Sequence, residues 1–225
     1  MSFQHEPAQS DLTVWGVGTT RTFRVHWMLH ELGIDYITKR IESRTGETNE
    51  HEYAHLNPKQ KIPTLVHGDL VISESFAIMR YLRSIVNTLP VDTYQESIEG
   101  RARYDEWSSF ILMELDATSL YVIRRHKDLP GIYGDAPAAV SSSMEYFSRM
   151  LQSVHHELTT DRPLWGDTFS EIDILMVIAL DWARAVGIEL PEKAAQYRRF
   201  MHQRAAYKSA FAHNFHDLQI PTIKR

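Results

Sequence analysis

Apolar positions along the first part of the chain alternate between short runs and helical stripes. Residues 12–15 form a short apolar run that ends at two glycines, which indicates a strand followed by a turn. Apolar side chains over 25–32 then recur every three or four residues and stop at Gly33, which predicts an amphipathic helix. A second strand is expected over 35–41, so the chain opens with a β-α-β unit.

The next segment predicts a hairpin and a helix. Residues 64–67 and 70–73 flank Gly68-Asp69, a two-residue hairpin signal, and a helical stripe covers 78–85. The order β-α-β followed by β-β-α is that of a thioredoxin-like domain, which we place at residues 10–87.

Residues 88–95 lack a regular pattern and are predicted to be a linker, while residues 96–225 are predicted to form an all-helical domain. The first long helix carries two apolar faces, of which the second either lines a cleft or is also buried. A further helix is expected over 144–158, after a loop at 128–137. The fold class is therefore α/β followed by all-α.

The most regular part of the second half begins at Ser170. Ser170 as N-cap and Asp173 three residues later form a capping box, and Phe169 with Ile174 supplies a hydrophobic staple. The following helix is apolar nearly all round, so we expect it to be buried at the centre of the helical domain.

Composition narrows the classes of function. The 225 residues carry 24 Lys and Arg against 29 Asp and Glu, a net charge of −5, which does not favour binding to nucleic acid or an anionic membrane. The absence of cysteine excludes disulfides and a cysteine nucleophile. Since the first residues do not resemble a signal peptide and no apolar run reaches about 20 residues, we expect a cytoplasmic protein that acts on small molecules.

Two short motifs resemble known binding signatures, one for zinc and one for dinucleotides, but the first lacks the usual surroundings and the second departs from the pattern. His51 to His55 spells H-E-x-x-H, which binds zinc on a long buried helix, but Pro58 follows closely and the neighbours are polar. A solvated turn is therefore favoured over a metal site. Gly16 to Arg21 resembles the dinucleotide fingerprint G-x-G-x-x-G, but Arg21 replaces the third glycine.

Hydroxyl groups gather where the first helix begins. Thr19, Thr20 and Thr22 lie at an end that carries unpaired N–H groups and about half a positive charge. This position would stabilise an anion such as a thiolate, and a thiolate would have to come from a ligand. The alternative is that these threonines only cap the helix.

Two further segments carry candidate binding groups. Pro63 enters a strand, which marks either an edge or a cis turn, and a cis bond would leave the backbone of Ile62 free to pair with an extended peptide. Ser75 opens the next helix and can bind a carboxylate, while Glu74 can pair with an ammonium group.

Taken together, four segments resemble the cytosolic glutathione transferase family. These are GTTRTFRVHWMLHELG, LNPKQKIPTL, SESFAIMRYL and LWGDTFSEIDILM, in the family's order and spacing. The resemblance covers the chain from about Leu12 onward. It implies a glutathione transferase fold with a thioredoxin-like and an all-helical domain, homodimeric assembly, and glutathione as co-substrate without a metal.

The resemblance also implies roles for individual residues. Glu74 and Ser75 match the γ-glutamyl site, Ile62 the residue whose backbone pairs with the cysteinyl portion, and Pro63 the cis-proline. Lys61 matches a lysine near the glycine carboxylate in theta-like and tau-like classes.

The activating hydroxyl aligns with Thr20 or Thr19, both threonine where serine is usual, and Thr20 is favoured. The expected reaction is attack of glutathione thiolate on a hydrophobic electrophile, either as conjugation or as peroxidase activity in detoxification. Trp107, Phe110 and Met113 are the candidate electrophile site. A noncatalytic binding protein of the same fold is the alternative.

Overall fold

The structure is a computed structural model that describes residues 11–86, 97–165 and 168–215. It divides into two compact units, one of residues 1–89 with 205–225 and one of residues 90–204. Within the described residues, no helix has the length and apolar character needed to span a membrane. The predicted linker at 88–95 lies outside the described residues, and the predicted domain boundaries stay a proposal.

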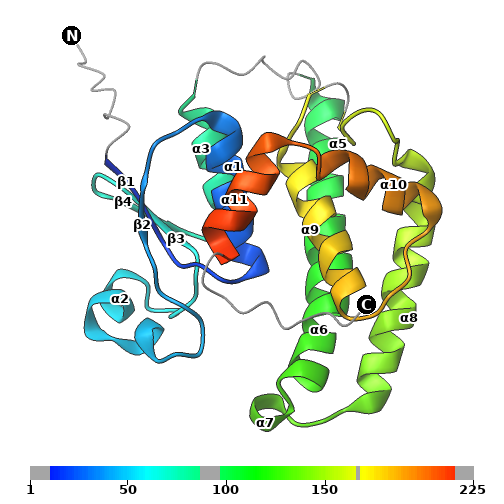
Figure 1. Cartoon of the computed structure of the whole chain (residues 1–225), viewed down its shortest axis with the longest axis horizontal. Coiled ribbons are helices and arrows are strands. Elements are labelled where there is room, and N and C mark those ends of the chain that lie inside the picture. Colours follow the sequence, from blue (N-terminus) through cyan, green and yellow to red (C-terminus); the bar gives the residue numbers. More distant parts are fainter. Residues whose placement is uncertain (1–10, 87–96, 166–167, 216–225) are drawn as a thin grey trace. The chain divides into compact units, whose positions relative to one another are not determined.

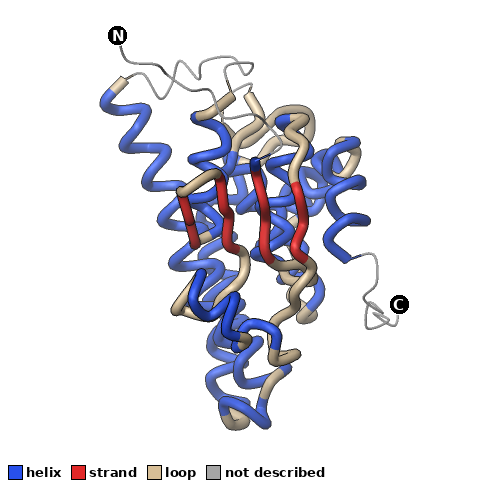
Figure 2. Tube along the Cα trace, turned by 90° about the vertical axis from the view of Figure 1, so that its left-hand side faces the viewer, coloured by secondary structure: helices blue, strands red, loops and turns tan. Residues whose placement is uncertain are grey.

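The first unit is built on a mixed four-stranded sheet (Figures 1 and 2). Its strands lie in the order β2-β1-β3-β4, with β1 parallel to β2 and antiparallel to β3, and β3 antiparallel to β4. Their bounds are β1 Leu12–Trp15, β2 Ile37–Lys39, β3 Thr64–His67 and β4 Leu70–Ser73. The expected hairpin at Gly68-Asp69 is confirmed, because His67 pairs with Leu70 across it. The second strand is shorter than the expected 35–41.

Helices α1, Thr20–Leu32, and α3, Ser75–Ser84, pack against each other in this unit, and the short α2 spans His51–Leu56. Helix α1 has a capping box at Thr19 and ends at Gly33, whose φ of 64° is accessible to glycine without strain. Helix α11, Ala205–Phe215, belongs to the same unit and lies against α1 (Figure 1). Phe23 of α1 contacts three aromatic rings of α11, at ring-centroid distances of 5.3–5.6 Å.

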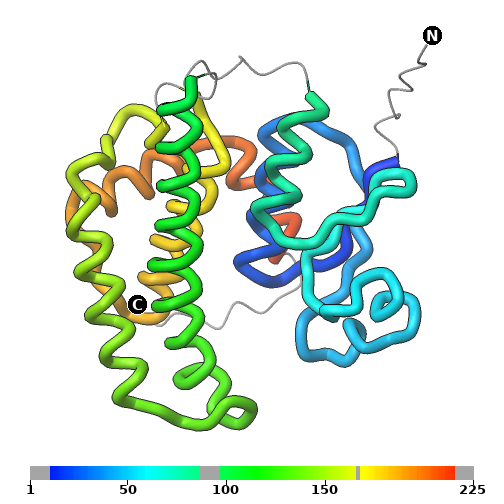
Figure 3. Tube along the Cα trace, turned by 180° about the vertical axis from the view of Figure 1, so that it is seen from behind, coloured from blue at the N-terminus to red at the C-terminus, as the bar shows by residue number. Residues whose placement is uncertain are grey.

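The second unit is helical, which confirms the expected fold class. The first long helix runs as α5, Ile98–Ser109, continues with π-type hydrogen bonding over Phe110–Leu120, and passes through α6, Tyr121–Ile123, to a second π-type segment, Arg124–Asp128. Helix α8 returns beside it (Figure 3). The remaining helices of the unit are α7 Pro130–Tyr133, α8 Pro137–Val154, α9 Glu171–Ala185 and α10 Glu192–Met201.

Helix α8 differs from the expected 144–158. It begins seven residues earlier because Pro137 occupies its first turn, where a proline has no N–H bond to lose. The segment before it, expected to be a loop, contains the short α7. The apolar stripe alone marks only the buried part of α8, so it missed the first two turns.

Helix α9 is the core of the second unit, as its sequence predicted. The capping box is confirmed, with the Ser170 N–H donating to Asp173 Oδ2 at 2.7 Å. Asp173 also accepts from the Leu164 N–H at 2.7 Å and from the Tyr197 hydroxyl at 2.6 Å. Because every residue from Glu171 to Leu180 is buried, this segment stabilises the helical unit.

Candidate functional site

The turn between β1 and α1 places the predicted threonines at the N-terminus of α1. Thr19 is the N-cap, and its Oγ1 accepts from the Thr22 N–H at 3.0 Å, while Thr22 Oγ1 accepts from the Thr19 N–H at 3.0 Å. Thr20 is half-buried, and its hydroxyl makes no hydrogen bond with the part of the chain that the structure describes. The two candidates therefore differ: Thr19 is used to cap the helix, whereas the Thr20 hydroxyl has its proton available for a ligand.

Gly16 lets this turn approach the segment that carries Ile62. Its φ is 111°, and a Cβ at this position would lie 2.5 Å from Ile62 Cβ and 3.1 Å from Thr22 Cγ2. Such contacts are far inside van der Waals distance, so only glycine fits here. Gly16, the first glycine of the dinucleotide-like motif, therefore serves close packing of the turn against Ile62.

The peptide bond between Ile62 and Pro63 is cis, as the resemblance implied. The Ile62 side chain is 8% exposed and packs on Gly16. Among the described residues, neither the N–H nor the C=O of Ile62 has a hydrogen-bond partner. An extended ligand could therefore pair with this backbone as an added strand.

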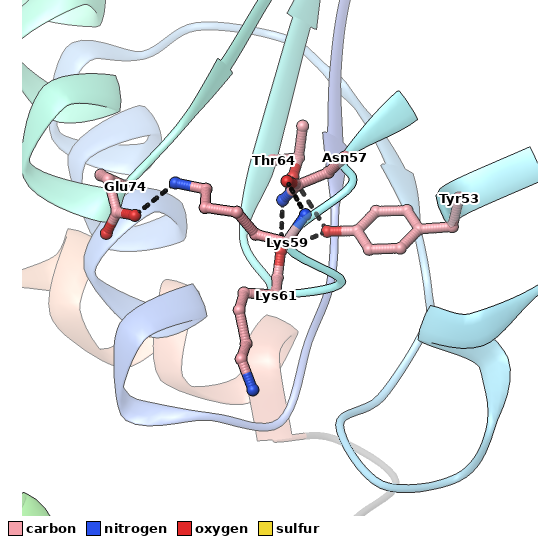
Figure 4. Close-up of polar contacts among 6 residues, drawn as sticks. All are labelled: Tyr53, Asn57, Lys59, Lys61, Thr64 and Glu74. Atoms are coloured by element: carbon pink, nitrogen blue, oxygen red, sulfur yellow. Dashed lines mark hydrogen bonds and ion pairs between the residues drawn. The ribbon is translucent and has the colours of Figure 1, made fainter. Parts of the chain in front are cut away.

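A set of buried polar groups holds the segment before Pro63 in place (Figure 4). The carbonyl of Lys61 accepts from the Tyr53 hydroxyl at 2.5 Å and from Asn57 Nδ2 at 2.8 Å. The same two side chains lie 2.9 and 3.0 Å from Thr64 Oγ1. Sequence reasoning missed both residues, although Asn57-Pro58 is a turn signal.

Tyr53 also lies within the H-E-x-x-H sequence, at one of its two variable positions. It is the buried residue of α2, while His51, Glu52 and His55 are exposed. The two histidine rings stack at 6.1 Å. No group of three or more potential metal ligands occurs among the described residues. Helix α2 therefore places Tyr53 against the loop before Pro63, while the three residues that define the motif face solvent.

Glu74 and Ser75 lie at the N-terminus of α3. Glu74 has a φ of 78° and a ψ of 113°, a conformation that costs a residue with a side chain about 1–3 kcal/mol. Its carboxylate is exposed and pairs with Lys59 at 2.5 Å, whereas Lys61 points away from it (Figure 4). Sequence reasoning did not single out Lys59, since surface lysines carry no pattern.

Ser75 is buried, and its Oγ accepts from Arg24 Nη1 at 3.4 Å. Arg24 comes from the middle of α1 and is 1% exposed. A buried guanidinium beside the N-terminal turn of α3 adds positive charge where a carboxylate would bind. The apolar pattern of α1 gives no sign of this role, because Arg24 occupies an otherwise apolar face.

His26 connects the turn between β1 and α1 to Tyr36. Its Nε2 lies 3.0 Å from the Gly16 carbonyl and its Nδ1 lies 2.8 Å from the Tyr36 hydroxyl. Burial, with smaller contributions from His213 and His30, lowers the pKa of His26 to about 3, although the hydrogen bond with Gly16 acts in the opposite direction. The neutral ring therefore donates to Gly16 and accepts from Tyr36.

The candidate electrophile residues lie in the second unit. Trp107 and Phe110 meet edge to face at 6.0 Å and line a pocket of about 750 Å³ together with Trp165. Met113 is 59% exposed and does not line this pocket. Of these three candidate side chains, Met113 is exposed, whereas Trp107 and Phe110 are half-buried.

Comparison with known proteins agrees with this geometry. Residues 10–84 match the family described as "Glutathione S-transferase, N-terminal domain". The chain is 25% identical to glutathione S-transferase TCHQD of Arabidopsis thaliana, over 85% of this chain and 86% of that protein. It is also 25% identical to glutathione S-transferase theta-1 of Bos taurus, over 74% and 72%.

A solved structure shows the same fold. The theta-class glutathione S-transferase from Xanthomonas axonopodis pv. citri, with glutathione bound, matches with a TM-score of 0.74 at 23% identity and covers 89% of this chain and 97% of its own. Residues 10–84 thus match the N-terminal domain model of the glutathione S-transferase family, and the chain shares the fold of a solved glutathione S-transferase.

Proposed function

We propose that the chain is a glutathione transferase, which binds glutathione on its first unit and activates the thiol for attack on a hydrophobic electrophile. The names of its relatives support this function. The observation that carries it is the gathering, in one unit, of three groups suited to one tripeptide: the N-terminus of α1, the unpaired backbone of Ile62 and the N-terminus of α3.

In this proposal the γ-glutamyl group of glutathione lies at α3. Ser75 and its N–H bind the α-carboxylate, with Arg24 behind them, and Glu74 binds the ammonium group. The Ile62 backbone pairs with the cysteinyl portion, and Lys61 lies near the glycine carboxylate. The strained conformation of Glu74 supports a binding role, because backbone strain of this kind clusters at ligand-binding and active sites.

Thr20 is the proposed thiol donor, and Thr19 the residue that caps the helix beneath it. A free thiol has a pKa of about 8.5, and lowering it by two units requires about 2.7 kcal/mol of preference for the thiolate. One charge-assisted hydrogen bond supplies about 1.5–3 kcal/mol, and the helix end about 0.3–1 kcal/mol. These two contributions suffice, so the proposal requires neither a general base nor a metal.

Trp107, Phe110 and Met113 are proposed as the surface that receives the electrophile. Their apolar side chains favour a hydrophobic substrate, which either accepts the sulfur in conjugation or is a peroxide that glutathione reduces. We further propose that the protein acts as a homodimer in the cytoplasm and takes part in detoxification, as the family resemblance implies.

The proposal is tested on glutathione-agarose and then by calorimetry. We expect the protein to be retained and eluted by free glutathione, and Ser75→Ala to bind glutathione roughly tenfold more weakly. Ser84→Ala is the matched control, because Ser84 is exposed at the other end of α3 and bonds only to the Tyr81 carbonyl among the described residues. Unchanged affinity in Ser75→Ala would contradict the assigned site.

Activity of the eluted protein on a panel of electrophiles separates the enzyme from its alternative. An enzyme accelerates conjugation or peroxide reduction above the uncatalysed rate. A noncatalytic binding protein of this fold would be retained on the column without such acceleration.

A further inference from the structure

Helix α11 ends beside the turn that carries the threonines, although the two segments are almost 200 residues apart in sequence (Figure 1). Asn214, near the end of α11, is completely buried. A buried primary amide needs partners for both its donor and its acceptor, because leaving either unpaired costs free energy. All of the partners that the structure gives its side chain lie in this turn or in the first turn of α1.

Four hydrogen bonds join Asn214 to the turn. Its Oδ1 accepts from Thr22 Oγ1 at 2.8 Å and from the Gly18 N–H at 3.3 Å, and its Nδ2 donates to the Thr19 carbonyl at 3.2 Å. The Gly18 N–H also lies 3.1 Å from the backbone carbonyl of Asn214. The peptide plane between Thr19 and Thr20 is therefore fixed from one side by the amide.

The turn needs such support because its sequence alone does not fix its shape. Gly16 and Gly18 have φ values of 111° and 81°, and glycine moves between conformations more freely than other residues. The first half of the turn is held elsewhere, since the Gly16 N–H donates to the Lys39 carbonyl and the Val17 N–H to the Ile41 carbonyl, both at 3.0 Å. At Gly18 and Thr19, within the part of the chain that the structure describes, Asn214 supplies the hydrogen bonds that do not come from the turn and α1 themselves.

We propose that Asn214 is a positioning residue for thiol activation, which acts through the Thr19–Thr20 peptide and the first turn of α1. This inference rests on the function proposed above. A hydroxyl that stabilises a thiolate must be held at a fixed distance and direction, since hydrogen bonds weaken steeply with misalignment. Asn214 provides that preorganisation from the far end of the chain and touches neither the thiol nor the γ-glutamyl group.

The proposal makes a split prediction, because the γ-glutamyl contacts lie at α3 and not at this turn. Asn214→Leu, which keeps the approximate size of the side chain and removes both polar groups, is expected to bind S-methylglutathione with nearly unchanged affinity. The pKa of bound glutathione, measured from thiolate absorbance against pH, is expected to rise by about one unit, a tenfold loss of thiolate below the pKa. A role confined to stability would leave this pKa unchanged in the folded variant.

Asn214→Asp tests the orientation of the amide with the shape conserved. It keeps an acceptor for Thr22 and Gly18 but faces the Thr19 carbonyl with a second oxygen and a negative charge. Because an ionised carboxylate placed against the Thr19–Thr20 peptide adds negative charge beside the proposed thiol donor, the thiol pKa is expected to rise at least as far as in Asn214→Leu. If Asn214→Leu does not fold, the thiol pKa measured in Asn214→Asp alone tests the proposal.

Phe211→Leu is the matched control. Phe211 lies on α11 and meets Phe23 at 5.6 Å, so its replacement weakens the packing of α11 without touching the turn. We expect lower stability and an unchanged thiol pKa. A shift as large as that in Asn214→Leu would show that docking of α11 matters and that the amide does not, which would overturn the proposal.

The failure of this inference can be told from failure of the proposed function. If wild-type protein binds glutathione with a lowered thiol pKa and both Asn214 variants retain it, the positioning role is wrong and the function stands. If wild-type protein does not bind glutathione or does not lower its thiol pKa, the function fails first, and the positioning role falls with it.

Discussion

Replacing Glu74 by alanine and by glycine separates its ligand contact from the strain of its backbone. Glu74 has a φ of 78° and a ψ of 113°, and only a residue without Cβ adopts such values freely. Glu74→Ala keeps Cβ and therefore the strain, but loses the ion pair with Lys59. Since that pair is largely exposed, its loss is expected to cost less than about 1 kcal/mol of unfolding free energy.

Glu74→Gly loses the same ion pair and removes the strain. Relief of about 1–3 kcal/mol is offset by about 0.5–1 kcal/mol of extra entropy that glycine gives the unfolded chain. The glycine variant should therefore unfold with a free energy about 1 kcal/mol above that of the alanine variant, within a range of about 0–2.5 kcal/mol. Urea titration followed by tryptophan fluorescence measures this difference.

Both variants should bind glutathione more weakly, because both lack the carboxylate that receives the ammonium group. Loss of one charge-assisted contact of about 1.5–3 kcal/mol corresponds to a roughly 10- to 150-fold higher Kd by calorimetry. A glycine variant clearly less stable than the alanine variant would show that the Glu74 backbone is not strained. Unchanged affinity in both variants would refute the placement of the γ-glutamyl group.

Four further perturbations test other parts of the account. Thr19→Val should lower the unfolding free energy by about 0.5–2 kcal/mol, because the helix loses its cap. Thr20→Val should leave stability nearly unchanged and raise the pKa of bound thiol by about one to two units. Equal effects of both variants on that pKa would contradict the division of roles between the two threonines. Gly16→Ala should destabilise the first unit and abolish retention on glutathione-agarose, because its Cβ would meet Ile62 at 2.5 Å; a fully stable, binding-competent variant would contradict the close packing. The pKa of His26 is about 3 in the folded state and about 6.5 in the unfolded state. Because the unfolded chain therefore binds the proton more readily, the unfolding free energy should fall as pH drops below 6.5, by about 2.7 kcal/mol at pH 4.5. Urea titrations at several pH values should show a weaker pH dependence in His26→Gln. Exhaustive dialysis against EDTA should leave activity intact, since the described residues contain no group of three or more side chains placed to hold a metal ion. Activity that is lost on dialysis and restored only by added zinc would contradict this prediction.

The fold was predictable because its signals are local. The hairpin at Gly68-Asp69, the end of α1 at Gly33 and the capping box at Ser170 each depend on residues within a few positions of one another. The beginning of α8 was missed because its first residues, PAAVSSS, carry no regular apolar stripe.

The candidate site was only partly predictable, because part of it depends on residues that are distant in the sequence. Its sequence motifs contain Glu74 and Ser75, but the groups that support them come from distant parts of the chain. Arg24 reaches Ser75 from another helix, and Asn214 reaches the threonines from the far end of the chain. A buried polar residue in a helix has no periodic signature, so such contacts become visible only when the elements are packed together.

The central claim is that this chain binds glutathione and holds it as a thiolate at neutral pH. A pH titration of the ultraviolet absorbance of the wild-type complex, with the S-methylglutathione complex as blank, measures this directly. The account predicts a bound-thiol pKa about two units below the free value of about 8.5. A pKa at or above the free value, in protein shown by calorimetry to be saturated with glutathione, would contradict it.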